Sequence, residues 1–136
     1  MLTFADTHYF IALLNAADDY HAAAMRWSRE SRRPMLTTSW VLVEVGDAMT
    51  APPYRSYFVS LVRALQEDAR VTILGPEPIL FDAGFDLFSR RPDKVWSLTD
   101  CISFVAMERA GAREALTADK HFVQAGFRVL LDKNTR

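Results

Sequence analysis

Short apolar runs alternate with longer amphipathic segments along this chain. The apolar runs are no longer than four residues and do not alternate apolar with polar positions, which is typical of strands buried on both faces of a parallel sheet. They lie at residues 2–5, 35–36, 71–74, 115–118 and 129–131. Because helical segments separate them, the pattern predicts an α/β fold with a short, mainly parallel central sheet covered by helices.

The segments between the apolar runs carry the signals of helices. Apolar positions recur there at spacings of three and four residues, and prolines or capping residues mark the ends. Pro34 ends one helix, Pro52 and Pro53 separate two others, and Gly111 is in the position of a carboxyl-terminal cap. The predicted helices span residues 7–15, a segment from Asp18 or Asp19 to the Arg-rich stretch, 40–49, 54–65, 79–88, 100–110 and 120–124.

Length and composition limit the class of protein. A chain of 136 residues, half of them hydrophobic, is expected to form a single domain over residues 1–136. Cys101 is the only cysteine, so an internal disulfide is ruled out and a reducing, cytoplasmic location is expected. Neither a signal peptide nor a membrane-spanning run is predicted. The net charge of −1 argues against binding of nucleic acid over the whole surface, although basic stretches occur at residues 26–33 and 90–94.

Four carboxylates stand near the ends or within the apolar faces of the predicted elements: Asp6, Glu44, Asp100 and Asp119. Asp6 and Asp119 directly follow predicted strands, and Asp100 opens a predicted helix. Ligands of open α/β sheets bind outside the carboxyl ends of the strands, where the following helices begin. The topology therefore predicts that the three aspartates lie at one edge of the sheet.

Glu44 needs a separate argument. On a helix it shares one face with Val41 and Ala48, so it interrupts an apolar stripe. A carboxylate is costly to bury there unless it is paired or bound to a metal. Each acid alone has a simpler explanation, because an aspartate can cap a helix and Glu44 could reach solvent at the edge of the stripe. A metal site is favoured only when all four acids are explained together.

The segments around the four acids resemble those of one family. They are Leu2-Thr-Phe-Ala-Asp6-Thr7, Thr38-Ser39-Trp-Val-Leu-Val-Glu44, Ser97-Leu-Thr99-Asp100-Cys101 and Ala115-Leu-Thr-Ala-Asp119-Lys-His-Phe122. In this order, and in a chain of this size, they make the chain similar to the PIN-domain nucleases, and most of all to the VapC-type toxins of bacterial VapBC toxin–antitoxin pairs. The resemblance runs from Leu2 to Leu131 and implies a PIN-like three-layer α/β/α fold.

The same resemblance implies a metal-dependent endoribonuclease that hydrolyses RNA phosphodiester bonds with a metal-activated water. Asp6, Glu44, Asp100 and Asp119 match the acidic quartet of the family, and Mg²⁺ or Mn²⁺ suits such oxygen ligands. We expect the three aspartates to bind the metal. Glu44 is expected either to bind it as well or to orient the attacking water.

Other residues beside the acids carry weaker indications. Thr7 and Thr99 match hydroxyl residues that would hold the carboxylates in place, although simple capping is the stronger explanation of Thr7. Cys101 lies inside a helix and is expected to be buried and structural. His121 could approach the acids, but on a short helix it is expected to be a polar residue at the edge.

The resemblance also implies partners. Toxins of this kind are usually neutralised by a small antitoxin whose tail lies across the acidic site, and they commonly form homodimers. A stripe of Tyr54, Tyr57, Phe58 and Leu61 is a candidate for part of the antitoxin surface, although core packing is its stronger explanation. The identity of the RNA target is not indicated.

Two alternatives to a nuclease stay open on the residues alone. One is a phospho-acceptor receiver domain, which also binds Mg²⁺ with acids at strand ends. It would need an acidic pair after the first strand and an acceptor Asp after a central strand, whereas Thr7 follows Asp6 and Gly75 follows the run at 71–74. The other alternative is a PIN-like module that binds RNA or protein without cleaving.

Overall fold

The computed structural model describes residues 1–134 and contains a five-stranded sheet in the order β3-β2-β1-β4-β5. All neighbouring strands pair in parallel, as the sequence predicts. The strands are β1 (Thr3–Ala5), β2 (Met35–Thr38), β3 (Val71–Leu74), β4 (Glu114–Leu116) and β5 (Arg128–Val129). The central strand β1 is buried along its whole length.

Helices connect the strands and begin and end close to the predicted positions. Thr38 caps the third of them, because its hydroxyl accepts a hydrogen bond from the backbone nitrogen of Val41. Gly111 ends the sixth with the left-handed conformation that glycine favours. The helices are α1 (Thr7–Leu14), α2 (His21–Glu30), α3 (Ser39–Ala48), α4 (Tyr54–Glu67), α5 (Pro78–Arg90), α6 (Leu98–Ala110) and α7 (Lys120–Gln124).

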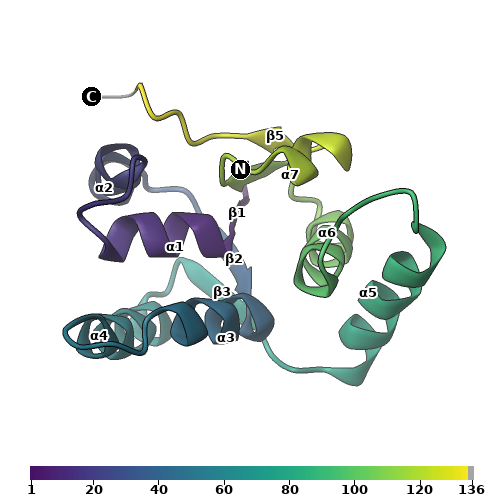
Figure 1. The fold of residues 1–136 in the computed structure, drawn as a ribbon, viewed down its shortest axis with the longest axis horizontal. Helices are drawn as coiled ribbons and strands as arrows, with labels where there is room; N and C mark the ends of the chain where they lie inside the picture. Colours follow the sequence, from purple (N-terminus) through teal and green to yellow (C-terminus); the bar gives the residue numbers. More distant parts are fainter. Residues whose placement is uncertain (135–136) are drawn as a thin grey trace.

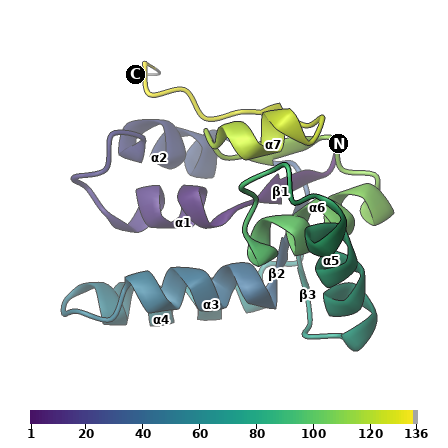
Figure 2. The same cartoon turned by 45° about the vertical axis from the view of Figure 1, so that its right-hand side comes forward.

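The helices form two layers around the sheet. In Figure 1, α1 to α4 lie on one side of the strands, while α5 and α6 lie on the other. Figure 2 shows α7 beside α6, where the rings of Phe104 and Phe122 meet edge to face with their centroids 4.9 Å apart. This is the expected three-layer α/β/α architecture.

The strand order creates one switch point. From β1 the chain moves outward to β2 and β3, and then returns to the opposite side of β1 with β4 and β5. Ligands bind at such a reversal, outside the carboxyl ends of the strands. The order 3-2-1-4-5 also differs from the flavodoxin-like order 2-1-3-4-5, in which receiver domains fold, so the receiver alternative is wrong.

Close packing between helices holds the second layer together. A Cβ atom on Gly84 of α5 would lie 2.3 Å from a side-chain carbon of Ile102 and 2.8 Å from its Cα atom. Only glycine therefore lets α5 approach α6 this closely. The contact supports α6, the helix that begins beside Asp100.

Several boundaries differ from the prediction. Strand β4 ends at Leu116 and not at residue 118, because the chain turns there and the backbone nitrogen of Thr117 donates to the carbonyl of Ala115. Strand β5 spans residues 128–129 in place of 129–131. Helix α2 begins only at His21, since Asp18 accepts a hydrogen bond from the backbone nitrogen of Tyr20 in the turn before it. None of the helices in residues 1–134 is long and apolar enough to cross a membrane.

Candidate metal centre

Asp6 occupies the switch point at the end of the central strand. Its backbone nitrogen donates to the carbonyl of Leu116 on the neighbouring strand β4. The residue is only 5% exposed, and although it stands in the N-cap position of α1 its side chain makes no capping hydrogen bond. The capping explanation considered from the sequence is therefore wrong for Asp6.

The electrostatic setting of Asp6 disfavours a free negative charge. Burial raises the pKa of this carboxyl to about 7, and the negative charges of Asp100 and Glu44 push it in the same direction. Hydrogen bonds from the Thr7 backbone and from the side chain of Thr117 oppose the rise without cancelling it. A buried carboxylate beside like charges is the setting that a bound cation stabilises.

Glu44 lies on α3 with an exposed side chain, and its charge acts on the carboxyl of Asp6. The expectation that it interrupts a buried stripe is wrong, because α3 buries Val41, Leu42 and Val45 and leaves both Glu44 and Ala48 exposed. Its reach toward solvent, the alternative considered from the sequence, is the arrangement observed. Its charge nevertheless acts on Asp6, so the two acids face the same space.

Asp100 and Asp119 both take part in helix capping. Asp100 forms a capping box with Ser97 at the start of α6, and Asp119 accepts a hydrogen bond from the backbone nitrogen of His121 at the start of α7. Burial raises the pKa of Asp100, and the neighbouring charge of Asp119 adds to this rise. Capping and metal binding are compatible here, because among the described residues no hydrogen bond reaches Oδ1 of Asp100 or Oδ2 of Asp119.

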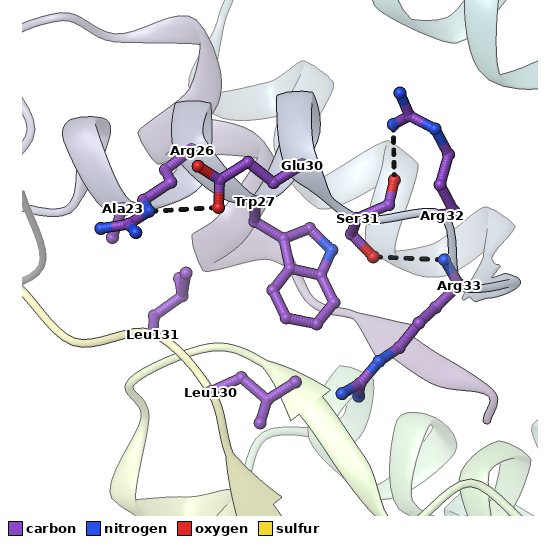
Figure 3. Close-up of a pocket in the computed structure, with 9 residues that line it drawn as sticks. All are labelled: Ala23, Arg26, Trp27, Glu30, Ser31, Arg32, Arg33, Leu130 and Leu131. Atoms are coloured by element: carbon purple, nitrogen blue, oxygen red, sulfur yellow. Dashed lines mark hydrogen bonds and ion pairs between the residues drawn. The ribbon is translucent and has the colours of Figure 1, made fainter.

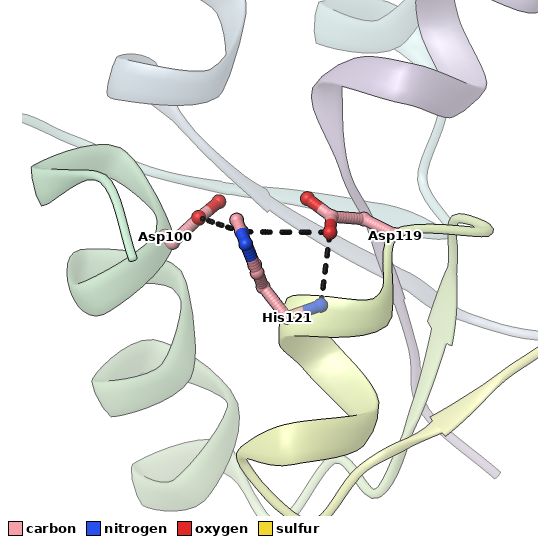
Figure 4. A group of neighbouring side chains, drawn as sticks. All are labelled: Asp100, Asp119 and His121. Carbon is pink, nitrogen blue, oxygen red and sulfur yellow. Dashed lines mark hydrogen bonds and ion pairs between the residues drawn. The ribbon is translucent and has the colours of Figure 1, made fainter. Parts of the chain in front are cut away.

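His121 lies between these two aspartates, an approach considered from the sequence only as the weaker of two possibilities. Its Nδ1 atom is 3.2 Å from Oδ2 of Asp100 and 3.5 Å from Oδ1 of Asp119 (Figure 4). The ring comes from the first turn of α7, and the packing of α7 on α6 brings it to Asp100. The expectation of a polar edge residue was therefore wrong. The sequence signal for this contact was the segment Asp119-Lys-His121, because a side chain two residues after Asp119 can turn back toward it.

The hydroxyl residues beside the acids do not form the expected hydrogen bonds. Thr7 Oγ1 is buried and has no hydrogen-bond partner among the described residues. No side-chain hydrogen bond from Thr99 to another described residue is present either. Thr117, which the sequence analysis did not single out, instead supplies hydroxyl contacts to Asp6 and to the backbone nitrogen of Asp119.

The donor set fits a hard divalent cation. Each acid interacts with the next through its charge, from Glu44 to Asp6, from Asp6 to Asp100 and from Asp100 to Asp119. Carboxylate oxygens are the ligands that Mg²⁺ and Mn²⁺ prefer. The four predicted acids are thus linked by pairwise charge interactions, and the group whose ligand atoms lie within 4.8 Å of one another consists of Asp100, Asp119 and His121.

Cys101 takes no part in this chemistry. It is fully buried, and burial together with the charge of Asp100 raises the pKa of its thiol to about 11. The thiol therefore stays neutral near pH 7 and cannot act as a nucleophile. The structural role expected from the sequence agrees with this burial.

A separate hollow of about 430 Å³ lies between α2 and the segment after β5 (Figure 3). Trp27, Leu130 and Leu131 form its apolar wall, and none of the four acids lines it. Arg33 extends over the Trp27 ring and pairs with Glu114, with 2.8 Å between the charged atoms. The basic stretch at residues 26–33 therefore serves, in part, to join α2 to the sheet.

The pKa of Asp6 predicts how stability depends on pH. A carboxyl whose pKa is higher in the folded state binds its proton more tightly there, so unfolding becomes easier as pH rises from about 4 to about 7. In EDTA, we expect Asp6→Asn to match the wild type near pH 4 and to exceed its free energy of unfolding by a few kcal/mol at pH 8. Urea denaturation at both pH values measures this. Equal stability of the two proteins at pH 8 would contradict the burial argument.

Comparison with known proteins agrees with the fold. The model of the PIN domain family matches residues 3–128. The 23S rRNA-specific endonuclease VapC20 of Mycobacterium tuberculosis is 26% identical over 127 residues, which cover 93% of this chain and 95% of the relative.

Two solved structures have the same fold. The crystal structure of M. tuberculosis VapC20, described as a sarcin-ricin loop cleaving toxin, aligns with a TM-score of 0.85 at 24% identity and covers 96% of this chain and 99% of that chain. VapBC2 from Rickettsia felis, bound to a DNA fragment from its promoter, aligns with a TM-score of 0.67 at 13% identity and covers 97% of this chain and 100% of that one. On the match of the family model over residues 3–128, this chain belongs to the PIN domain family.

Proposed function

We propose that this chain is a metal-dependent endoribonuclease and the toxin of a toxin–antitoxin pair. The observation that carries the proposal is the buried carboxylate of Asp6, which stands among like charges at the switch point of the sheet. Such an arrangement costs stability unless a cation binds it, so it is hard to explain as structure alone. The likeness to VapC20, a 23S rRNA endonuclease, supports RNA as the substrate.

Asp6, Asp100 and Asp119 would hold Mg²⁺ or Mn²⁺, and Glu44 would act from the exposed side of the cluster. When bound, the metal activates a water and stabilises charge on the phosphate. The aspartates fix the position of this charge because β1 and the first turns of α6 and α7 hold them. Glu44 is free to turn toward solvent, so it is suited to accept a hydrogen bond from the attacking water and orient it.

Cleavage of RNA should depend on the buried acids. We expect Asp6→Asn and Asp100→Asn each to lower the rate of cleavage by at least about a hundredfold, because each removes charge from the cluster. Gel analysis of a mixed RNA pool, and of intact 23S rRNA in ribosomes, with added Mg²⁺ or Mn²⁺ measures the rate.

A surface acid supplies the matched control. Asp86 pairs with Arg90 on α5, and its side chain is 62% exposed, so Asp86→Asn should cleave at the wild-type rate. Circular dichroism checks that all variants are folded. Persistent cleavage by folded Asp6→Asn and Asp100→Asn would exclude this site, and a wild type that binds RNA without cleaving it would favour the silent binding module.

The antitoxin would bind in a groove between α1, α2 and α4. The groove has a volume of about 190 Å³, and its α4 wall includes Leu61, Ala64 and Leu65. Tyr57 lies one turn before Leu61 on the same helical face and is 48% exposed. An amphipathic helix with an apolar face fits such a groove.

The stripe on α4 therefore divides into two parts. Phe58 packs on the core, and its ring lies where a Cβ atom on Gly46 of α3 would be 3.0 Å away. Tyr54 and Leu61 are also packed against the core, whereas Tyr57 extends outward. Core packing therefore explains Tyr54, Phe58 and Leu61, and Tyr57 remains the candidate for contact with a partner.

Substitutions at different positions of this stripe should affect antitoxin binding and the stability of the fold differently. We expect Tyr57→Ala to weaken binding of the small protein encoded by the adjacent open reading frame by about tenfold or more, with little change in melting temperature. Phe58→Ala should instead lower the melting temperature, because it opens a cavity beside Gly46. Calorimetric titration and thermal melts measure both. Val59→Ala, also on α4 and 40% exposed, is the control, and equal binding by Tyr57→Ala and Val59→Ala would exclude this surface.

A homodimer would form through α5. Phe81, Phe85 and Phe88 recur at spacings of four and three residues, so they share one helical face, and their exposed fractions are 38%, 54% and 47%. An aromatic face of this kind on a surface helix is typical of an interface between chains.

Charge on this face should separate the chains. We expect the wild type to have the mass of a dimer in light scattering and Phe85→Glu to have the mass of a monomer, because a carboxylate would be buried in the contact. Val95→Glu changes a side chain that is 88% exposed outside α5, and it should remain a dimer. A dimeric Phe85→Glu variant would place the interface elsewhere.

A further inference from the structure

The imidazole of His121 is held within the acidic cluster and not merely near it. Figure 4 shows its ring between the carboxylates of Asp100 and Asp119, which come from α6 and from the loop before α7. The ring is partly buried, and its side chain is 23% exposed. The proposed function described above assigns no role to this residue.

The spacing of the three groups fits a single ion. Asp100, Asp119 and His121 each offer one ligand atom, and these atoms lie within 4.8 Å of one another. Six ligands at about 2.1 Å around a cation lie roughly 3 Å apart when adjacent. Nδ1 lies 3.2 Å from Oδ2 of Asp100 and 3.5 Å from Oδ1 of Asp119, which is close to that value. Each of these oxygens also accepts a helix-capping hydrogen bond, and a carboxylate oxygen with two lone pairs can accept such a bond and still bind an ion.

We propose that His121 is a nitrogen ligand of the divalent ion held by Asp100 and Asp119. The inference rests on the proposed metal centre and names a further residue in it. Nδ1 lies within hydrogen-bonding distance of Asp100. Binding through Nδ1 would require the neutral tautomer that carries its proton on Nε2.

A nitrogen ligand changes which ion the centre prefers. Mg²⁺ takes oxygen ligands almost exclusively, whereas imidazole is a common ligand of first-row transition metals. A centre of carboxylates alone would accept Mg²⁺ readily. With His121 in the set, the centre should bind Mn²⁺ more tightly than Mg²⁺.

The other two histidines of the chain face other groups. Nδ1 of His8 accepts a hydrogen bond from the backbone nitrogen of Ala118, and Nδ1 of His21 lies 2.7 Å from the carbonyl oxygen of Ala12. His121 is the histidine whose ring contacts the carboxylates. With three histidines in the sequence, a nitrogen signal from the metal can be assigned by substitution.

Pulsed electron paramagnetic resonance of bound Mn²⁺ tests this directly, without any measurement of activity. We expect the wild type to show coupling of the electron spin to a ¹⁴N nucleus, and the coupling to change to that of ¹⁵N when histidine is labelled. It should vanish in His121→Gln and in His121→Asn and persist in His21→Gln. Mn²⁺ bound without nitrogen coupling in the wild type, or coupling that survives both His121 variants, would overturn the proposal.

Calorimetric titration of Mn²⁺ and Mg²⁺ adds a second readout. His121→Gln should weaken Mn²⁺ binding by about tenfold or more and change Mg²⁺ binding much less. Equal losses for both ions would mean that His121 only orients the carboxylates, which overturns its role as a ligand. If the wild type cleaves RNA but shows no nitrogen coupling, His121 is not a ligand and the proposed nuclease function still holds. If it shows nitrogen coupling but does not cleave RNA, His121 is a ligand and the proposed nuclease function is wrong.

Discussion

The burial of one carboxylate among like charges is the constraint on which the site depends. Asp6 directly follows the central strand at the point where the strand order reverses, and the charges of Glu44 on α3 and Asp100 on α6 act on it. Burial and, to a smaller extent, these charges raise the pKa of Asp6 to about 7, which is a setting that a bound cation would stabilise. The buried charge of Asp6 thus lowers the stability of the fold locally. Groups that lower stability in this way are common at active sites.

The neighbouring strands hold the buried carboxylate of Asp6 in place, because they fix the end of β1. The hydroxyl of Thr37 on β2 donates to the carbonyl of Ala5, at 2.9 Å, and both groups are buried. On the other side, the backbone of Asp6 pairs with Leu116 of β4. Thr38, next to Thr37, caps α3, the helix that carries Glu44. Two neighbouring threonines therefore tie the position of Asp6 to the start of the helix that carries Glu44.

Periodicity and strand ends were enough to predict the sheet and the place of the aspartates. They predict it because parallel strands share one carboxyl edge, so Asp6 and Asp119, which follow β1 and β4, belong at the same edge of the sheet. The same reasoning placed the end of β4 two residues too late, since the turn at Thr117 depends on a local hydrogen bond and not on hydrophobicity. Asp119 still reaches the site, because the loop after β4 brings it back.

Two side chains show what periodicity could not predict. The exposure of Glu44 depends on which face of α3 packs on the core, and this face follows Val41 and Val45. The position of His121 depends on the packing of α7 against α6, through Phe122 and Phe104. Both depend on tertiary contacts between different elements, so they cannot be predicted from residue spacing or from helix and strand propensity.

The central claim is that the four acids form one cation site at the switch point. The most direct measurement is anomalous diffraction from crystals of the protein grown with Mn²⁺, which locates the ion without reference to activity. The account predicts an anomalous peak about 2–2.5 Å from carboxylate oxygens of Asp6, Asp100 or Asp119. A well-diffracting crystal with no peak at this edge of the sheet, or with Mn²⁺ bound only elsewhere, would contradict it.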